Sequence, residues 1–266
     1  NNSLAQANPL VLGEDHKGSL SASDTVDYWK FEIQARAYIN VFLGEIPAGS
    51  DYDLELIKDG VTIRSFTATS NKDELGVKLD VDKGSYALRV KAYSNPQAGK
   101  LYRVRAAYTA ISRAREWVDV SMPYCRQTNG KNDSYCNKLC TRPAKPEWDV
   151  YRSDCSGYVS WAWGLAAAGL TTSQLGAQSS PFSTIKVTDL QPGDILVHAS
   201  ADNGHTFLFK RWVDKAARRI LILEEFDCKS VAMEREIVLS TVSATNTATS
   251  LQGDGRAYTA MRYRMP

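Results

Sequence analysis

Hydrophobic and polar side chains alternate in short segments along the first part of the chain, up to Tyr108. A period of two is typical of strands that bury one face, and Gly and Asp residues between such segments mark turns. The alternating segments are residues 28–33, 37–43, 54–57, 61–66, 76–81, 86–92 and 102–108. Short strands at this spacing predict an N-terminal antiparallel β-sandwich.

The period changes from two to helical near Thr109. The apolar residues that then fall on one face of an amphipathic helix are Ala110, Ile111, Ala114, Trp117 and Val118. We therefore place a domain boundary here, with a first domain over residues 1–109 and a second over residues 110–266.

The second domain begins with helical patterns and continues with strand-like ones. Residues 159–170 are apolar nearly all round, which predicts a buried helix. The strand-like segments are residues 193–199, 205–213, 220–226, 231–238 and 258–263. Helices followed by antiparallel strands predict an α+β domain.

A polar turn precedes the buried helix and carries a cysteine. Ser153 and Asp154 favour a helix start, so Cys155 is expected in the first turn. Unpaired N–H groups and the positive end of the helix dipole stabilise an anion there, which favours a thiol pKa below about 8.5. The alternative is a core cysteine or half of a disulfide.

The composition limits the possible functions. The chain has 266 residues and a net charge of +2, with no basic run, so nucleic-acid binding is not indicated. No apolar segment approaches the roughly 18 residues of a membrane span. The sequence begins at Asn1 without a signal-peptide pattern, which fits either a cytosolic protein or the mature form of a secreted one.

The cysteines favour the secreted form. Besides Cys155 there are four, at Cys125, Cys136, Cys140 and Cys228, enough for two disulfides. One leftover thiol is expected of a thiol enzyme in an oxidising compartment. A zinc site is the rival, but the C-x3-C pair lacks a second close pair or a nearby histidine. We predict disulfides of undetermined pairing and no metal or cofactor.

Two motifs in the second domain resemble those of the NlpC-type cell-wall cysteine peptidases, a papain-like group. The first is Asp154-Cys155-Ser156-Gly157 with the aromatic residue that follows, and the second is residues 190–196 followed by residues 204–209. The resemblance covers about residues 110–266. It implies a papain-like α+β thiol hydrolase, with its nucleophile at the N-terminus of a buried helix that packs on an antiparallel sheet.

The resemblance also assigns roles to single residues. Cys155 is the nucleophile, and His205 is the imidazole base, whereas His198 and His16 are expected to lie elsewhere. The third group follows on the next strand, where this chain has Glu224 and Glu225. An acid is a departure from the family, but a carboxylate can stabilise an imidazolium. Since neighbours on a strand face opposite sides, only one can serve, and we prefer Glu224.

Three further residues are expected to line the substrate. By the resemblance, Tyr124 lies against the cleft, and Asp154 and Ser156 recognise the amine end of the substrate. The alternatives are a buried tyrosine for the first and helix-capping residues for the other two. The backbone N–H of Cys155, with a neighbouring donor, is expected to form the oxyanion hole.

The first domain resembles the bacterial pre-peptidase C-terminal domain, a jelly-roll module of secreted hydrolases. The matching segments are residues 18–20, 27–31, 51–56 and 83–90, although the module here precedes the catalytic domain. Four carboxylates, Asp24, Asp27, Asp51 and Asp53, offer oxygens for calcium, but such residues more often form turns.

The two resemblances together imply a secreted hydrolase of peptidoglycan stem peptides that cuts γ-D-glutamyl–diamino-acid bonds. Two alternatives stay open. One is a thiol acyltransferase or amidase toxin of the same fold with another substrate. The other is a non-catalytic cell-surface binding protein in which Cys155 is disulfide-bonded. The sequence leaves the oligomeric state open.

Overall fold

The computed structural model describes residues 1–34, 36–142, 145–177, 179 and 181–263. Its contacts divide the chain into two units, Asn1–Thr109 and Ala110–Pro266. In the described part of the chain, no helix is both long and apolar enough to cross a membrane.

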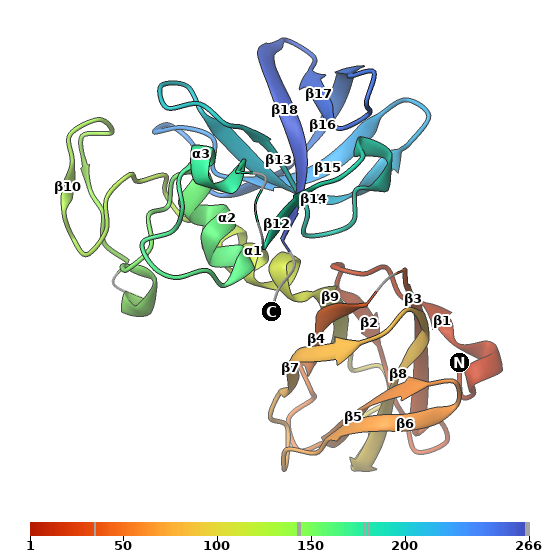
Figure 1. Ribbon diagram of the computed structural model, residues 1–266. Helices are drawn as coiled ribbons and strands as arrows, with labels where there is room; N and C mark the ends of the chain where they lie inside the picture. The colour runs from red at the N-terminus through yellow and green to blue at the C-terminus, as the bar shows by residue number, and fades with distance from the viewer. Residues whose placement is uncertain (35, 143–144, 178, 180, 264–266) are drawn as a thin grey trace. The chain divides into compact units, whose positions relative to one another are not determined.

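The N-terminal unit consists of two sheets (Figure 1). One has the order β1-β3-β8-β5-β6 and the other β2-β9-β4-β7. The short helix η1 (Leu4–Gln6) precedes the strands, which are β1 (Asn8–Pro9), β2 (His16–Gly18), β3 (Val26–Ile33), β4 (Ala37–Gly44), β5 (Asp51–Lys58), β6 (Val61–Phe66), β7 (Glu74–Val81), β8 (Gly84–Ser94) and β9 (Tyr102–Tyr108). The alternating residues Leu54 and Leu56 on β5 and Leu88 and Val90 on β8 are fully buried, so they form part of the core.

A hydrogen-bonded triad ties β3 to β9 inside this unit. Trp29 Nε1 donates to the Tyr102 hydroxyl at 3.0 Å, and that hydroxyl donates to Asp27. Burial raises the pKa of Asp27. Its carboxyl accepts the Tyr102 hydrogen bond inside the core. None of the four aspartates considered for calcium belongs to a described cluster close enough to hold an ion.

The C-terminal unit is built mainly of strands. They are β10 (Asn132–Asp133), β11 (Lys138–Leu139), β12 (Phe182–Thr184), β13 (Ile195–His198), β14 (His205–Asp214), β15 (Arg219–Glu224), β16 (Met233–Val242), β17 (Ala248–Leu251) and β18 (Asp254–Tyr263). The main sheet has the order β12-β18-β13-β14-β15-β16-β17, and β17 also pairs with β18. This second pairing closes the sheet on itself, around an interior that contains Phe207, Ile222, Leu239 and Tyr258.

The helices of this unit are short. They are α1 (Thr109–Asp119), α2 (Cys155–Trp163) and α3 (Thr172–Leu175), with the 3-10 turns η2 (Pro146–Trp148) and η3 (Val187–Asp189). The indole rings of Trp117 on α1 and Trp161 on α2 stack with centroids 5.8 Å apart, and Figure 1 shows both helices beside the strands.

The prediction of an α+β, papain-like C-terminal domain is wrong. Strands make up 45% of the structure and helices 13%, with three α-helices among the described residues. The helix expected over residues 159–170 ends at Trp163, because Gly164 adopts the left-handed conformation with a φ of 67° and caps it. The sequence pattern also missed β17, the strand through which the sheet closes.

Two disulfides hold the loop that precedes α2, as the cysteine count predicted. Cys125 is bonded to Cys140, and Cys136 to Cys228. The buried carboxylate of Asp133 orders the loop between them, since it accepts hydrogen bonds from the amides of Arg126 at 2.7 Å, Tyr135 at 3.0 Å and Cys136 at 3.3 Å. Cys155 is the one free cysteine.

We expect the two disulfides to stabilise the fold unequally. They close loops with sequence separations of 15 and 92 residues. Because the entropy that a crosslink removes from the unfolded chain grows with loop length, replacing Cys136 and Cys228 by serine should cost about 1.6 kcal/mol more than replacing Cys125 and Cys140. Urea unfolding followed by tryptophan fluorescence measures this difference, and equal costs would contradict the loop-length argument.

Candidate active site

The start of α2 is fixed by a cap on Asp154. Its Oδ1 accepts hydrogen bonds from the Gly157 amide at 2.7 Å and the Ser156 hydroxyl at 3.1 Å. Its Oδ2 accepts one from Arg152 Nε at 2.9 Å. Asp154 is therefore the N-cap residue of α2, and the Ser156 hydroxyl supports this cap. These contacts agree with the capping role, which was the alternative to a role in substrate recognition.

Gly157 allows the first turn of α2 to approach the preceding chain. A Cβ atom at this position would lie 2.1 Å from the Arg152 carbonyl oxygen, far inside van der Waals contact. The glycine of the Asp-Cys-Ser-Gly motif therefore has a steric cause. It lets the chain fold tightly against the turn that carries Cys155.

Cys155 is buried, with 6% of its surface exposed. Burial and, to a smaller extent, nearby Asp154 raise the pKa of its thiol to about 12, although the amides of Thr206 and Ser156 lower it. The low pKa expected from the helix N-terminus is therefore wrong for this protein, because desolvation outweighs the dipole. The Thr206 amide also places the sulfur beside the residue that follows His205.

His205 and Glu224 form a buried pair. His205 Nε2 lies 3.1 Å from Glu224 Oε2, and the two residues are 3% and 0% exposed. They begin β14 and end β15, which pair through Leu208 and Leu223. Burial raises the pKa of Glu224, but hydrogen bonds from His205 and Arg235 outweigh it and hold that pKa below its usual range.

Arg235 is a site residue that the sequence analysis did not single out. Its Nε donates to Glu224 Oε1, so Glu224 is held from both sides. Met233 is the register partner of Glu224, and Arg235 lies two residues further along β16 on the same face. The Phe226 ring contacts the His205 ring edge-on, with centroids 5.3 Å apart. The contact between Arg235 and Glu224 follows from the register of β15 and β16.

Tyr124 lies near Cys155. Burial raises the pKa of its hydroxyl, and the neighbouring Cys155 and Asp154 raise it further. The backbone of the adjacent Cys125 exchanges two hydrogen bonds with Ser153, of 2.9 and 3.2 Å. The disulfide-bonded loop is thus tied to the residues immediately before α2.

Glu225 has a different environment from Glu224. It is 0% exposed, and neither of its carboxyl oxygens has a hydrogen-bond partner in the described part of the chain. Burial raises its pKa to about 10, more than Arg142 and Lys138 lower it, so the carboxyl is protonated at neutral pH. The structure brings Glu224, and not Glu225, to His205.

The other two histidines have different hydrogen-bond partners from those of His205. His198 is the register partner of His205 on β13, and its ring nitrogens contact Ala257 O at 2.9 Å and Asn203 Oδ1 at 3.3 Å. His16 lies in the N-terminal unit, where its Nε2 accepts a hydrogen bond from the Val11 amide at 3.0 Å.

Residues of the second motif, 190–196, are held by hydrogen bonds to β18 and to the end of α2. Asp194 is bound by the guanidinium of Arg262 at 2.7 and 2.8 Å, and it accepts a hydrogen bond from the Gln191 amide at 2.6 Å. The Gly193 carbonyl accepts one from Trp163 Nε1 at 2.7 Å, which links the motif to the end of α2.

No family model matches the chain, and neither does any curated protein. Among solved structures it is similar to the pre-peptidase C-terminal domain of a collagenase from Bacillus anthracis, with 23% identity, 40% of this chain and 99% of that chain covered, and a TM-score of 0.33. It is also similar to carbohydrate-binding module CBM36 in complex with calcium and xylotriose, with 18% identity, 36% and 90% covered, and a TM-score of 0.23. A third is the periplasmic lysozyme inhibitor PliG of Aeromonas hydrophila, with 14% identity, 37% and 93% covered, and a TM-score of 0.24. None of these three is an NlpC-type peptidase.

Replacing Glu225 by glutamine should stabilise the protein more as the pH rises. The folded protein keeps this carboxyl protonated up to about pH 10, whereas an unperturbed carboxyl ionises near 4.5. Ionisation therefore favours the unfolded chain increasingly between these values. The advantage of Glu225→Gln should grow from pH 5 to pH 8, by at most about 1.4 kcal/mol per pH unit.

Urea unfolding at the two pH values measures that advantage. Glu236→Gln is the matched control, since the Glu236 side chain is 41% exposed and pairs with Arg219 at the surface. An advantage of Glu225→Gln that stays constant with pH would contradict the assignment of a neutral carboxyl.

Proposed function

We propose that the C-terminal unit is a thiol hydrolase that acts outside the cytoplasm and cleaves an amide bond in peptidoglycan stem peptides. The observation that carries the proposal is a free cysteine at a helix start beside a buried imidazole–carboxylate pair. Two disulfides fit an oxidising compartment. The cell-wall substrate rests on the resemblance of two motifs to those of NlpC-type peptidases.

In this mechanism the thiol is neutral at rest and must lose its proton to react. Because Glu224 engages Nε2 of His205, Nδ1 is the nitrogen that takes the proton from Cys155 Sγ. The amides of Thr206 and Ser156 stabilise the thiolate that forms. The sulfur then adds to the amide carbonyl carbon, and the carbonyl oxygen becomes an oxyanion.

The same groups complete the reaction. The backbone N–H of Cys155 at the start of α2 is the proposed donor to the oxyanion. The His205 imidazolium returns its proton to the leaving amine, which departs as the C–N bond breaks and leaves a thioester. Water, deprotonated by His205, hydrolyses the thioester and restores the thiol. Glu224 stabilises the imidazolium during both steps.

The proposed substrate class rests on the motif resemblance. We propose cleavage between γ-D-glutamyl and the diamino acid, with Tyr124, Asp154 and Ser156 next to the scissile bond. The atypical acidic third residue, Glu224, favours a second candidate, a thiol acyltransferase or amidase that acts on another acyl group.

Replacing Cys155 by alanine should abolish turnover without unfolding the protein, because the side chain that attacks the carbonyl is gone. The measurement is mass spectrometry of purified peptidoglycan and soluble muropeptides after digestion. Products that appear with the native protein and not with Cys155→Ala identify the bond. If neither protein cuts and Cys155 still reacts with iodoacetamide, the second candidate takes precedence.

The two adjacent glutamates provide a matched pair of variants. Glu224→Gln should lower kcat by on the order of 10²–10⁴, because a neutral amide stabilises the imidazolium poorly. Glu225→Gln should leave kcat within about twofold of the native value, since its carboxyl is already neutral. Steady-state kinetics on the same muropeptide tests both, and equal losses would refute the role given to Glu224.

A further inference from the structure

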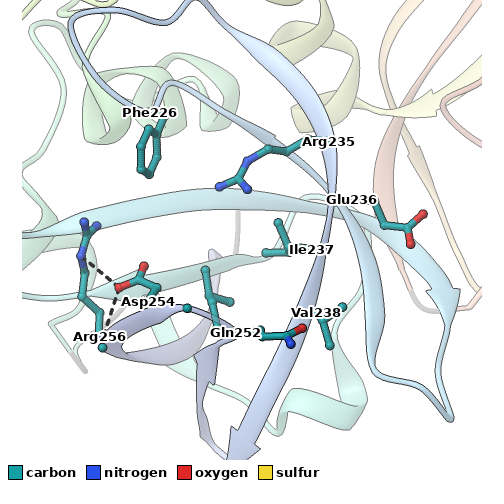
Figure 2. Close-up of a pocket in the computed structure, with 11 residues that line it drawn as sticks. Phe226, Arg235, Glu236, Ile237, Val238, Gln252, Asp254 and Arg256 are labelled. Atoms are coloured by element: carbon teal, nitrogen blue, oxygen red, sulfur yellow. Dashed lines mark hydrogen bonds and ion pairs between the residues drawn. The ribbon is translucent and has the colours of Figure 1, made fainter.

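A groove is lined by Arg235 and Phe226, two residues that contact the His205–Glu224 pair (Figure 2). It has a volume of about 580 Å³ and lies between the first half of β16 and the turn that joins β17 to β18. β17 ends at Leu251, whose partner on β16 is Leu239, so the part of β16 before Leu239 borders open space. Ile237 and Leu251 contribute the apolar lining.

Arg235 belongs both to this groove and to the active site. Its Nε donates to the buried Glu224, while 41% of its side chain remains exposed. Its guanidinium lies 5.5 Å from the centre of the Phe226 ring, and Figure 2 shows it directed toward that ring. An arginine has five N–H donors. No described residue accepts a hydrogen bond from the two Nη groups, which are therefore available to an occupant of the groove.

The acidic residues of the groove are already engaged. The Glu236 carboxylate pairs with Arg219 at 2.9 Å, and Figure 2 shows it directed away from Arg235. Asp254 accepts hydrogen bonds from the Tyr258 hydroxyl at 2.7 Å and the Arg256 amide at 3.1 Å. Arg235 therefore offers an occupant a cation whose donors are not used up by these carboxylates.

We propose that Arg235 is a positioning and specificity-determining residue, whose Nε orients Glu224 and whose Nη groups bind a carboxylate of the peptide that occupies the groove. A planar guanidinium can bind carboxylates on two of its edges at once. The substrate class is thus a peptide with a free carboxylate in the part that occupies the groove. This inference rests on the proposed function.

Such an arrangement couples recognition to catalysis. A bound carboxylate restrains the Arg235 guanidinium, which restrains Glu224 and through it the His205 ring. A substrate that carries the carboxylate should therefore have a higher kcat as well as a lower KM, since the imidazole is held in the reactive orientation. An amidated substrate would leave the guanidinium with only Glu224.

The kinetic test compares a muropeptide with a free carboxylate and its carboxyl-amidated form. The native enzyme should prefer the acid by about tenfold or more in kcat/KM, as expected for a hydrogen bond to a charged group. Arg235→Gln should reduce this preference to less than about twofold, and Arg235→Lys should retain part of it. Arg218→Gln removes a surface cation that does not line the groove, and it should retain all of this preference. An unchanged preference in Arg235→Gln overturns the proposal.

The pH profile separates positioning from general loss of structure. Since Arg235 helps to hold the pKa of Glu224 down, the acid limb of kcat should move to higher pH in Arg235→Gln and not in Arg218→Gln. A lower kcat with an unmoved acid limb would remove the positioning role.

Binding without turnover separates failure of this inference from failure of the proposed function. Calorimetric titration of Cys155→Ala with the two peptides should give a Kd at least about tenfold lower for the acid, and the added change Arg235→Gln should abolish the difference. This result would stand even if the native protein cleaved neither peptide. Equal Kd values for both peptides overturn the carboxylate assignment whatever the activity.

Discussion

The proposed site depends on one buried carboxylate. An ionised group in the interior needs charged partners and hydrogen bonds, because desolvation alone would neutralise it. Glu224 has both, with His205 on one oxygen and Arg235 on the other. The hydrogen bonds from His205 and Arg235 keep it ionised, and the ionised carboxylate in turn orients the imidazole.

The closed sheet brings these three residues together. They come from β14, β15 and β16, three consecutive antiparallel strands, and the register fixes where each side chain lies. A slip of one residue between β15 and β16 would turn Arg235 to the opposite face. Ile222 lies two residues before Glu224 on β15 and belongs to the buried interior of the sheet. Moving it out of this interior makes such a slip unfavourable. The packing of the sheet therefore supports the chemistry proposed for its end.

Sequence patterns predicted individual strands and helix starts well, but they did not predict that the C-terminal sheet closes through β17. The alternating segments lie in strands, and the Ser-Asp turn marks the start of α2. The extent of that helix was overestimated, since Gly164 ends it and the three alanines that follow do not continue it. β17 has only four residues, Ala248–Leu251, and little periodicity, so its double pairing had no sequence signal. Arg235 was missed because its proximity to Glu224 comes from the strand register and not from spacing along the sequence.

The thiol shows why position on a helix does not fix reactivity. A helix N-terminus favours an anion, but the effect is confined to the first turn and is modest beside desolvation. Cys155 is buried, and Asp154, which caps the same helix, adds a nearby negative charge. Both raise the pKa of the thiol above its ordinary value. In the proposed mechanism the imidazole that accepts its proton must therefore be held firmly, and Glu224 is the residue that holds it. In the proposed mechanism, the burial of the thiol thus makes its activation depend on the carboxylate.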